Sequence, residues 1–235
     1  MAYIHTLFNK KGDMNFESSD LITIALLVLL EGLLSADNAI VLAVQVMPLP
    51  ENQQKKALKY GIVGAFVFRT IAVFLAVYLI HIPIVKILGG LYLGYLAIDH
   101  FIHKSKEPEK QAPTPKKFFG FSAFWSTVIA VELTDIVFSV DSILAAVALS
   151  NKKWVIITGG IIGIIAMRMV AGAFLSMIKR FPKLVDGAYI IVFFIGAKLF
   201  SEYFEFYLAK WITFAVIGII FAVSILASIY EKRKK

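Results

Sequence analysis

Long apolar blocks separated by short polar segments constrain this chain more than any other feature. Four of these blocks are Leu21–Leu30, Ile62–Ile80, Val155–Met177 and Ile212–Ile229. Runs of about 20 apolar residues match a helix that crosses the roughly 30 Å hydrocarbon core of a bilayer. A water-soluble chain of this length cannot bury so many helices that are apolar on all sides. The sequence therefore predicts an all-α integral membrane protein.

The composition excludes several classes of protein. Hydrophobic residues make up 59% of the 235 residues and charged residues only 17%, against about 25% charged in an average soluble domain. No cysteine is present, so disulfides, thiolate metal sites and cysteine nucleophiles are excluded. The net charge of +8 comes from lysines in short segments between the apolar blocks. That pattern is typical of cytoplasmic loops, and we expect lipid rather than nucleic acid as a partner.

Hydropathy and helix breakers divide the chain into seven expected transmembrane helices. Pro48 and Pro50 follow the first helix, Pro83 separates the second from the third, and Pro182 separates the fifth from the sixth. The expected helices cover Leu21–Met47, Ala57–Ile80, Ile84–Ile102, Ser122–Leu149, Trp154–Met177, Leu184–Tyr207 and Trp211–Tyr230.

Basic residues are distributed unevenly between the two sides that seven spans would create. One side, which includes the C-terminus, holds 15 of them and the other holds six. Cytoplasmic loops of membrane proteins are enriched in Lys and Arg. The sequence therefore predicts a multi-pass protein of the cell membrane with its N-terminus outside and its C-terminus in the cytoplasm.

Two segments of the chain share a pattern that indicates an internal repeat. Without a gap, the segment from Glu31 to Asn38 aligns with the segment from Asp135 to Ser142, an offset of 104 residues. Further along, at an offset of 99, Arg69 aligns with Arg168, Pro83 with Pro182 and Phe101 with Phe200. Each unit contains three helices, an odd number, so the two units are expected to be inverted relative to each other, as in many secondary transporters.

The repeat divides the chain into five expected regions. They are an extracytoplasmic N-terminal segment (1–20), a first three-helix repeat (21–103), a flexible cytoplasmic linker (104–121), a second three-helix repeat (122–207), and a seventh helix with a basic cytoplasmic tail (208–235).

Acidic residues inside the apolar segments are the candidate functional residues. A carboxylate at the centre of a bilayer costs roughly 2.5–3.5 kcal/mol on insertion scales. Helical spacing places Glu31, Ser35 and Asn38 on one face, and it does the same for Asp135, Ser139 and Ser142, with Glu132 one turn earlier. Asp37 and Asp141 lie off these faces. Either they face a neighbouring helix, or the helix unwinds locally near Ser35.

The candidate ligands are all oxygen atoms, from carboxylates, an amide and hydroxyls. Hard oxygen ligands suit Mg²⁺, Ca²⁺ or Mn²⁺ rather than Zn²⁺ or Cu⁺. Two other interpretations remain open: the acids pair with Arg69, Arg168 or Lys198 and hold helices together, or they form a proton relay. No His-Glu-x-x-His pair or serine–histidine arrangement lies in the spans, so we expect no enzymatic activity.

At these residues the chain resembles the TerC family of integral membrane proteins. The segments that carry the resemblance are Glu31-Gly-Leu-Leu-Ser35-Ala-Asp37-Asn38 and Glu132-Leu-Thr-Asp135-Ile-Val-Phe138-Ser139-Val-Asp141-Ser142. The resemblance runs from about Leu21 to Tyr230. It implies Mn²⁺ efflux and a role in manganese homeostasis, and in some bacteria the supply of metal to secreted enzymes. Carried over by motif, the expected metal residues are Glu31, Asp37, Asn38, Glu132, Asp135, Asp141 and Ser142.

We therefore expect a transporter that exports Mn²⁺ from the cytoplasm through a carboxylate-lined site between two inverted repeats. Mn²⁺ is the transported ion, and no tightly bound cofactor is expected. A homo-oligomer or a partner in the secretion machinery remains open. The alternative is a membrane scaffold of a metal-stress or secretion-linked complex, in which the buried acids are structural.

Overall fold

A computed structural model describes residues 16–79, 84–106 and 120–234, and these residues form helices without a strand. The all-α prediction is confirmed for them. Most of the N-terminal segment expected at 1–20 and most of the linker expected at 104–121 lie outside the described residues. The helices are α2 Ser18–Val46, α3 Glu51–Leu79, α4 Ile84–Lys106, α5 Ala123–Leu149, α6 Lys153–Arg180, α7 Leu184–Tyr203 and α8 Lys210–Lys234.

The helices overlap the expected spans, but some of their ends differ. Helix α3 begins at Glu51, six residues before the expected start, and α4 continues to Lys106. The sixth expected helix is the one that is shorter than predicted by several residues. The sequence pattern predicts a helix that continues to Tyr207, but α7 ends at Tyr203. Glu205 has a positive φ of 61°, a left-handed conformation that a continuing right-handed helix excludes. The backbone N–H of Phe206 turns back to the Ser201 carbonyl at 3.2 Å, so the chain reverses there before α8 begins.

By length and apolar composition, three helices in the described residues qualify as membrane spans. They are α6, α7 and Lys210–Arg233 of α8. Helix α2 is bent by 54° between two parts, Ser18–Gly32 and Ser35–Val46. If these two parts are counted as one span, α2 is a fourth membrane-span candidate. Gly and Ser are frequent at sharp helix kinks, and Gly32 and Ser35 flank this one. The prediction of seven spans stays a prediction.

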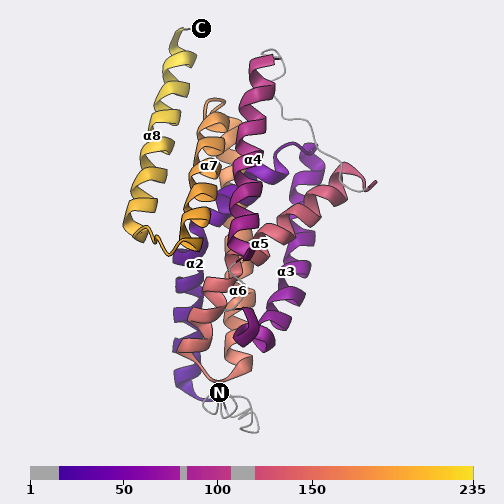
Figure 1. The fold of residues 1–235 in the computed structure, drawn as a ribbon, viewed down its shortest axis with the longest axis vertical. Coiled ribbons are helices and arrows are strands. Elements are labelled where there is room, and N and C mark those ends of the chain that lie inside the picture. The colour runs from indigo at the N-terminus through magenta and orange to yellow at the C-terminus, as the bar shows by residue number, and fades with distance from the viewer. Residues whose placement is uncertain (1–15, 80–83, 107–119, 235) are drawn as a thin grey trace.

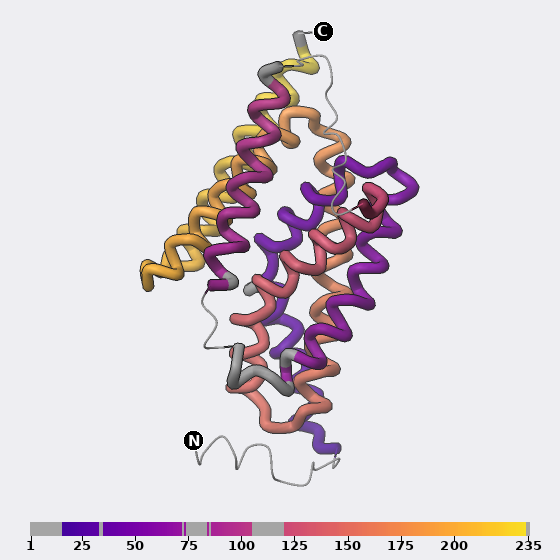
Figure 2. The backbone as a smooth tube through the Cα atoms, turned by 45° about the vertical axis from the view of Figure 1, so that its right-hand side comes forward, coloured from indigo at the N-terminus to yellow at the C-terminus, as the bar shows by residue number. Residues whose placement is uncertain are grey.

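Of the described helices, four form one part of the molecule and three form the other. Helix α2 packs against α5 and α6, and α3 packs against the same two helices. Helix α4 packs on α7, and α7 packs in turn on α8. Figure 1 shows α8, α7 and α4 beside one another in the upper part, while α2, α3, α5 and α6 extend downwards. Figure 2 shows the same division in a view turned by 45°.

The α4–α7 contact depends on glycine. A Cβ atom built on Gly90 would lie 2.7 Å from the Gly196 carbonyl oxygen, and one built on Gly196 would lie 2.8 Å from the Gly90 carbonyl oxygen. Real Cβ atoms do not approach oxygen this closely, so only two glycines allow the two backbones to touch. Small residues at interfaces permit this close packing of helices in membranes.

Ion pairs connect the N-terminus of α2 to the turn between α5 and α6. The Lys152 ammonium lies 3.1 Å from Glu17 Oε1 and 3.0 Å from Asp20 Oδ2. Asp20 also accepts a hydrogen bond from the Glu17 backbone N–H at 2.8 Å, which caps the helix. The hydrogen bond that Lys152 donates to Asp20 raises the pKa of Lys152 above the ordinary lysine value. These contacts hold the start of α2 beside α6.

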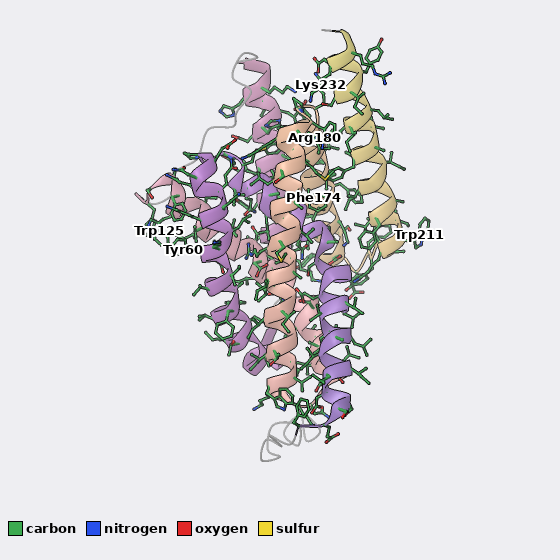
Figure 3. The ribbon with its side chains drawn as sticks, turned by 180° about the vertical axis from the view of Figure 1, so that it is seen from behind. Tyr60, Trp125, Phe174, Arg180, Trp211 and Lys232 are labelled. Atoms are coloured by element: carbon green, nitrogen blue, oxygen red, sulfur yellow. The ribbon has the colours of Figure 1, made fainter. Side chains whose placement is uncertain are left out.

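Helix α8 has most of its contacts with α7. Near its C-terminus, Lys232 Nζ donates a hydrogen bond to the Arg180 carbonyl oxygen at 2.9 Å. At its other end Trp211 is 71% exposed and points away from the other helices in Figure 3. This end of α8 is therefore not covered by the other described helices.

Candidate functional site

Four helices meet at the guanidinium group of Arg69. From α3, its Nη2 donates to Glu31 Oε1 of α2 at 2.9 Å and to Ser142 Oγ of α5 at 3.0 Å. Its Nη1 donates to the Gly160 carbonyl oxygen of α6 at 3.3 Å. Glu31 is 6% exposed and accepts a further hydrogen bond from Ser35 one turn later. This is a tight, buried ion pair between helices distant in sequence.

A second arginine occupies a similar position with looser contacts. Arg168 Nη2 of α6 lies 3.6 Å from Glu132 Oε1 and 3.8 Å from Asp135 Oδ2, both of α5. It donates to the Gly61 carbonyl oxygen of α3 at 3.4 Å. Within the described residues, Arg168 Nε, Arg168 Nη1 and Glu132 Oε1 are buried without a hydrogen-bond partner. Buried polar atoms without partners are uncommon, and here they gather at one place.

The two arginines make reciprocal contacts across the α3–α6 interface. Arg69 binds the carbonyl of Gly160, and Arg168 binds the carbonyl of Gly61. Each glycine precedes the arginine of its own helix by eight residues, and the two pairs are 99 residues apart. This is the offset at which the sequence analysis aligned the arginines.

Glycines bring the acids close to the neighbouring helices. A Cβ atom on Gly163 would lie 2.5 Å from Glu31 Cγ, and one on Gly64 would lie 2.4 Å from Glu132 Oε2. Gly64 and Gly163 are also 99 residues apart. Any larger residue at either position must displace an acidic side chain.

A small cavity of about 20 Å³ lies beside the Arg69 group. Its polar lining comes from Glu31, Arg69 and Ser142, and the rest is apolar side chains and Gly160. A space of this size holds about one water molecule or one ion of similar size. The cavity is formed by α2, α3, α5 and α6.

The remaining acids belong to a second cluster, which we call the acid–lysine chain. Its members are Asp37 of α2, Lys198 and Glu202 of α7, Lys86 of α4 and Asp141 of α5. Lys198 Nζ lies 3.6 Å from Asp37 Oδ2. Lys86 Nζ lies 3.3 Å from Asp141 Oδ1. Glu202 lies between the two lysines and pairs with both.

Asp37 and Asp141 have different surroundings although they align in the repeat. The Asp37 side chain is 11% exposed, whereas the Asp141 side chain is 58% exposed. Both residues are helical, and both face lysines of α4 or α7. The first of the two options left open by the sequence, a neighbouring helix, is therefore correct for both acids, although α2 also bends just before Asp37.

The family described as Integral membrane protein TerC family matches residues 16–235. The chain belongs to the TerC family of integral membrane proteins. No solved structure matches it.

Relatives of this TerC-family chain occur in several bacteria. It is 46% identical over 211 residues to "Uncharacterized membrane protein YceF" of Bacillus subtilis, covering 89% of this chain and 82% of that protein. It is 40% identical to "Uncharacterized membrane protein YkoY" of the same organism, covering 74% of this chain and 57% of that protein. It is 28% identical to "UPF0053 inner membrane protein YgdQ" of Escherichia coli K12, covering 81% of this chain and 85% of that protein.

The structure distributes the seven predicted metal residues over three places. Glu31 and Ser142 share Arg69, while Glu132 and Asp135 share Arg168. Asp37, Asn38 and Asp141 lie at the acid–lysine chain, where the Asn38 N–H donates to Asp37 Oδ1. In the described part of the chain, no three His, Asp or Glu side chains lie close enough to hold one metal ion. The assignment of these residues as metal ligands stays a prediction.

Several residues of these clusters were missed by the sequence analysis. Lys86, near the start of the third expected helix, was only counted among the six basic residues of the N-terminal side. Glu202 was not considered, because it does not belong to an acidic motif. Gly61 and Gly64 had a detectable signal. They align with Gly160 and Gly163 at the same offset as the two arginines, so extending the repeat alignment would have identified them.

Proposed function

We propose that this protein exports Mn²⁺ from the cytoplasm through a site between two inverted three-helix repeats. The observation that carries the proposal is the meeting of buried acids from α2 and α5 with arginines from α3 and α6. Four ionisable side chains lie there, Glu31, Arg69, Asp135 and Arg168, each less than 9% exposed. Ionisable groups inside a membrane protein usually mark an ion or substrate path.

The reciprocal arginine–glycine contacts support the inverted repeat. Exchange of α2 with α5 and of α3 with α6 converts the Arg69–Gly160 contact into the Arg168–Gly61 contact. It also converts the Glu31–Arg69 pair into the Asp135–Arg168 pair. Transporters with such repeats place the ion site where the repeats meet.

Differences between the two halves support alternating access. The Glu31–Arg69 pair is 2.9 Å long, whereas the Asp135–Arg168 pair is 3.8 Å long. Of the two aligned aspartates, only Asp141 is largely exposed. Rocking of one repeat against the other would exchange the two environments and expose the ion on the opposite side.

The chemistry of the donors supports a hard divalent ion. The acids offer only oxygen, and the cavity beside Ser142 has room for one small ion. In the absence of an ion, the arginines and lysines neutralise the acids. A divalent cation must displace these contacts to bind. The resemblance of the two acidic motifs narrows the ion to Mn²⁺ and suggests export, and uptake of protons by the vacated acids would drive the return.

Charge distribution supports the proposed orientation. We place the N-terminus outside the cell membrane and the C-terminus in the cytoplasm, because 15 basic residues lie on the C-terminal side and six on the other. The proposal includes no tightly bound cofactor and no enzymatic activity. The proposed partners are Mn²⁺, as the transported ion, and membrane lipid. A second copy of the chain and a protein of the secretion machinery remain open as further partners.

A specific observation favours the alternative, a membrane scaffold with structural acids. Each of the five predicted acids lies within 4 Å of a basic side chain. Pairing of this kind stabilises helix contacts without any ion. In a transporter the acids are needed to bind the ion, whereas in a scaffold they are needed to hold the helices together. Variants of the acids therefore distinguish the two functions.

Growth in the presence of manganese tests the proposal. Cells that lack their own Mn²⁺ exporters should gain tolerance and lose intracellular manganese when they express this chain. Asp37→Ala and Asp141→Ala should abolish the gain at unchanged membrane protein levels, whereas Glu205→Ala, an exposed acid outside the helices, should retain it. Unchanged intracellular manganese on expression of the wild type would refute export. Loss of folded protein in both aspartate variants would favour the scaffold.

A further inference from the structure

Glu202 has a central place in the acid–lysine chain. Its Oε2 lies 2.9 Å from Lys86 Nζ, and its Oε1 lies 3.9 Å from Lys198 Nζ. Each lysine also faces an aspartate, Asp141 for Lys86 and Asp37 for Lys198. Glu202 is therefore the carboxylate that both lysines share, and its own side chain is only 9% exposed.

The two lysines behave as tethered cations at the aspartates. A free cation that binds Asp37 or Asp141 has to displace an ammonium group that the fold already holds there. The displaced ammonium then needs another partner, because leaving a charge unpaired in a poorly hydrated place is expensive. Lysine has a flexible four-carbon stem, so its ammonium group moves several ångströms without any change of the backbone.

Glu202 is placed to be that partner. Lys198 and Glu202 are four residues apart on α7, so they lie on the same face of the helix. Lys86 already makes its shorter contact with Glu202 and its longer one with Asp141. Both lysines can leave their aspartates and stay paired with Glu202.

We infer that Glu202 is a positioning residue that receives Lys86 and Lys198 when a divalent cation takes Asp37 and Asp141. This inference rests on the proposed function and adds to it a residue outside the acidic motifs. It also gives a reason for divalent selectivity. A monovalent ion offers an aspartate no more charge than the tethered ammonium already provides, whereas a divalent ion offers twice as much.

Transport by the purified full-length chain in liposomes tests the inference. Mn²⁺ entry is followed with an enclosed dye that Mn²⁺ quenches, over a range of Mn²⁺ concentrations. We expect Glu202→Gln to raise the half-saturating Mn²⁺ concentration at least tenfold, because the displaced lysines lose their second partner. Glu205→Gln, a nearby exposed acid, is the matched control and should not change it.

Removal of the lysines separates positioning from simple support of the fold. Adding Lys86→Met and Lys198→Met to Glu202→Gln should return the half-saturating concentration to within about threefold of the wild type, because no ammonium then competes. Lys198→Met alone should lower that concentration, an effect that loss of structure would not produce. Thermal unfolding in detergent checks that each variant is folded.

The outcomes are distinct. Wild-type transport together with an unchanged Glu202→Gln variant overturns the inference and leaves the proposed function standing. A Glu202→Gln defect that removal of the lysines does not repair overturns it as well, as does a Lys198→Met variant with unchanged or raised half-saturation. A wild-type protein that moves no Mn²⁺ overturns the proposed function, and the inference with it.

Discussion

Replacement of Arg69 with methionine should destabilise the protein strongly. The change removes the guanidinium that pairs with Glu31 at 2.9 Å and also binds Ser142 and the Gly160 carbonyl. Glu31 is 6% exposed, and among the described residues only the Ser35 hydroxyl would still donate a hydrogen bond to it. Removal of one partner of a buried ion pair costs about 3–5 kcal/mol. We expect a loss of that size in the free energy of unfolding.

Two further variants test whether the loss comes from the unpaired charge. Adding Glu31→Gln to Arg69→Met removes the stranded carboxylate and should recover most of the stability, a coupling of about 2–3 kcal/mol. Arg168→Met should cost less, about 1–2 kcal/mol. Its contacts with Glu132 and Asp135 are 3.6 and 3.8 Å long, and two of its nitrogens lack a hydrogen bond in the described structure.

Unfolding by sodium dodecyl sulphate in mixed micelles, followed by circular dichroism, measures these free energies. Arg233→Met near the exposed end of α8 serves as the control and should change little. The reasoning fails if Arg69→Met costs less than about 1 kcal/mol, or if the double variant is no more stable than Arg69→Met alone.

Two other predictions follow from local geometry. Gly163→Ala should lower the free energy of unfolding by about 1–3 kcal/mol, because its Cβ atom would lie 2.5 Å from Glu31 Cγ. A Cβ atom on Gly94 would meet nothing within 4 Å, so Gly94→Ala should be neutral or stabilising by up to about 1 kcal/mol. Equal changes in the free energy of unfolding for the two glycine variants in the micelle assay would contradict this prediction. Asp20→Asn should lower the pKa of Lys152 towards the ordinary lysine value, as measured by NMR of labelled lysine. Since that pKa is raised in the folded protein, the contact contributes fully below the lysine value of about 10.4 and is lost as the pH rises through the raised pKa. An unchanged pKa in the variant would contradict the assignment.

Much of the fold was predictable because the apolar blocks and prolines define helices locally. Within the described residues, the seven helices overlap the seven expected spans. The predicted end of α7 was wrong, because aromatic residues continue to Tyr207 while the backbone reverses at Glu205. The bend of 54° in α2 was not predicted, because a helix that kinks and a helix that runs straight have the same hydrophobic pattern.

The sequence alone determined which ionisable residues lie among apolar neighbours and which of them are related by the repeat. Alignment of the two segments related Glu31 to Asp135 and Arg69 to Arg168, since the offset between related residues is a property of the sequence itself. Only the tertiary structure decided which charges meet. Arg69 contacts Glu31 across two helices, and Glu202 joins two lysines to two aspartates. Those contacts depend on how α2, α4, α5 and α7 pack, and interhelical packing is not encoded in the pattern of any single segment.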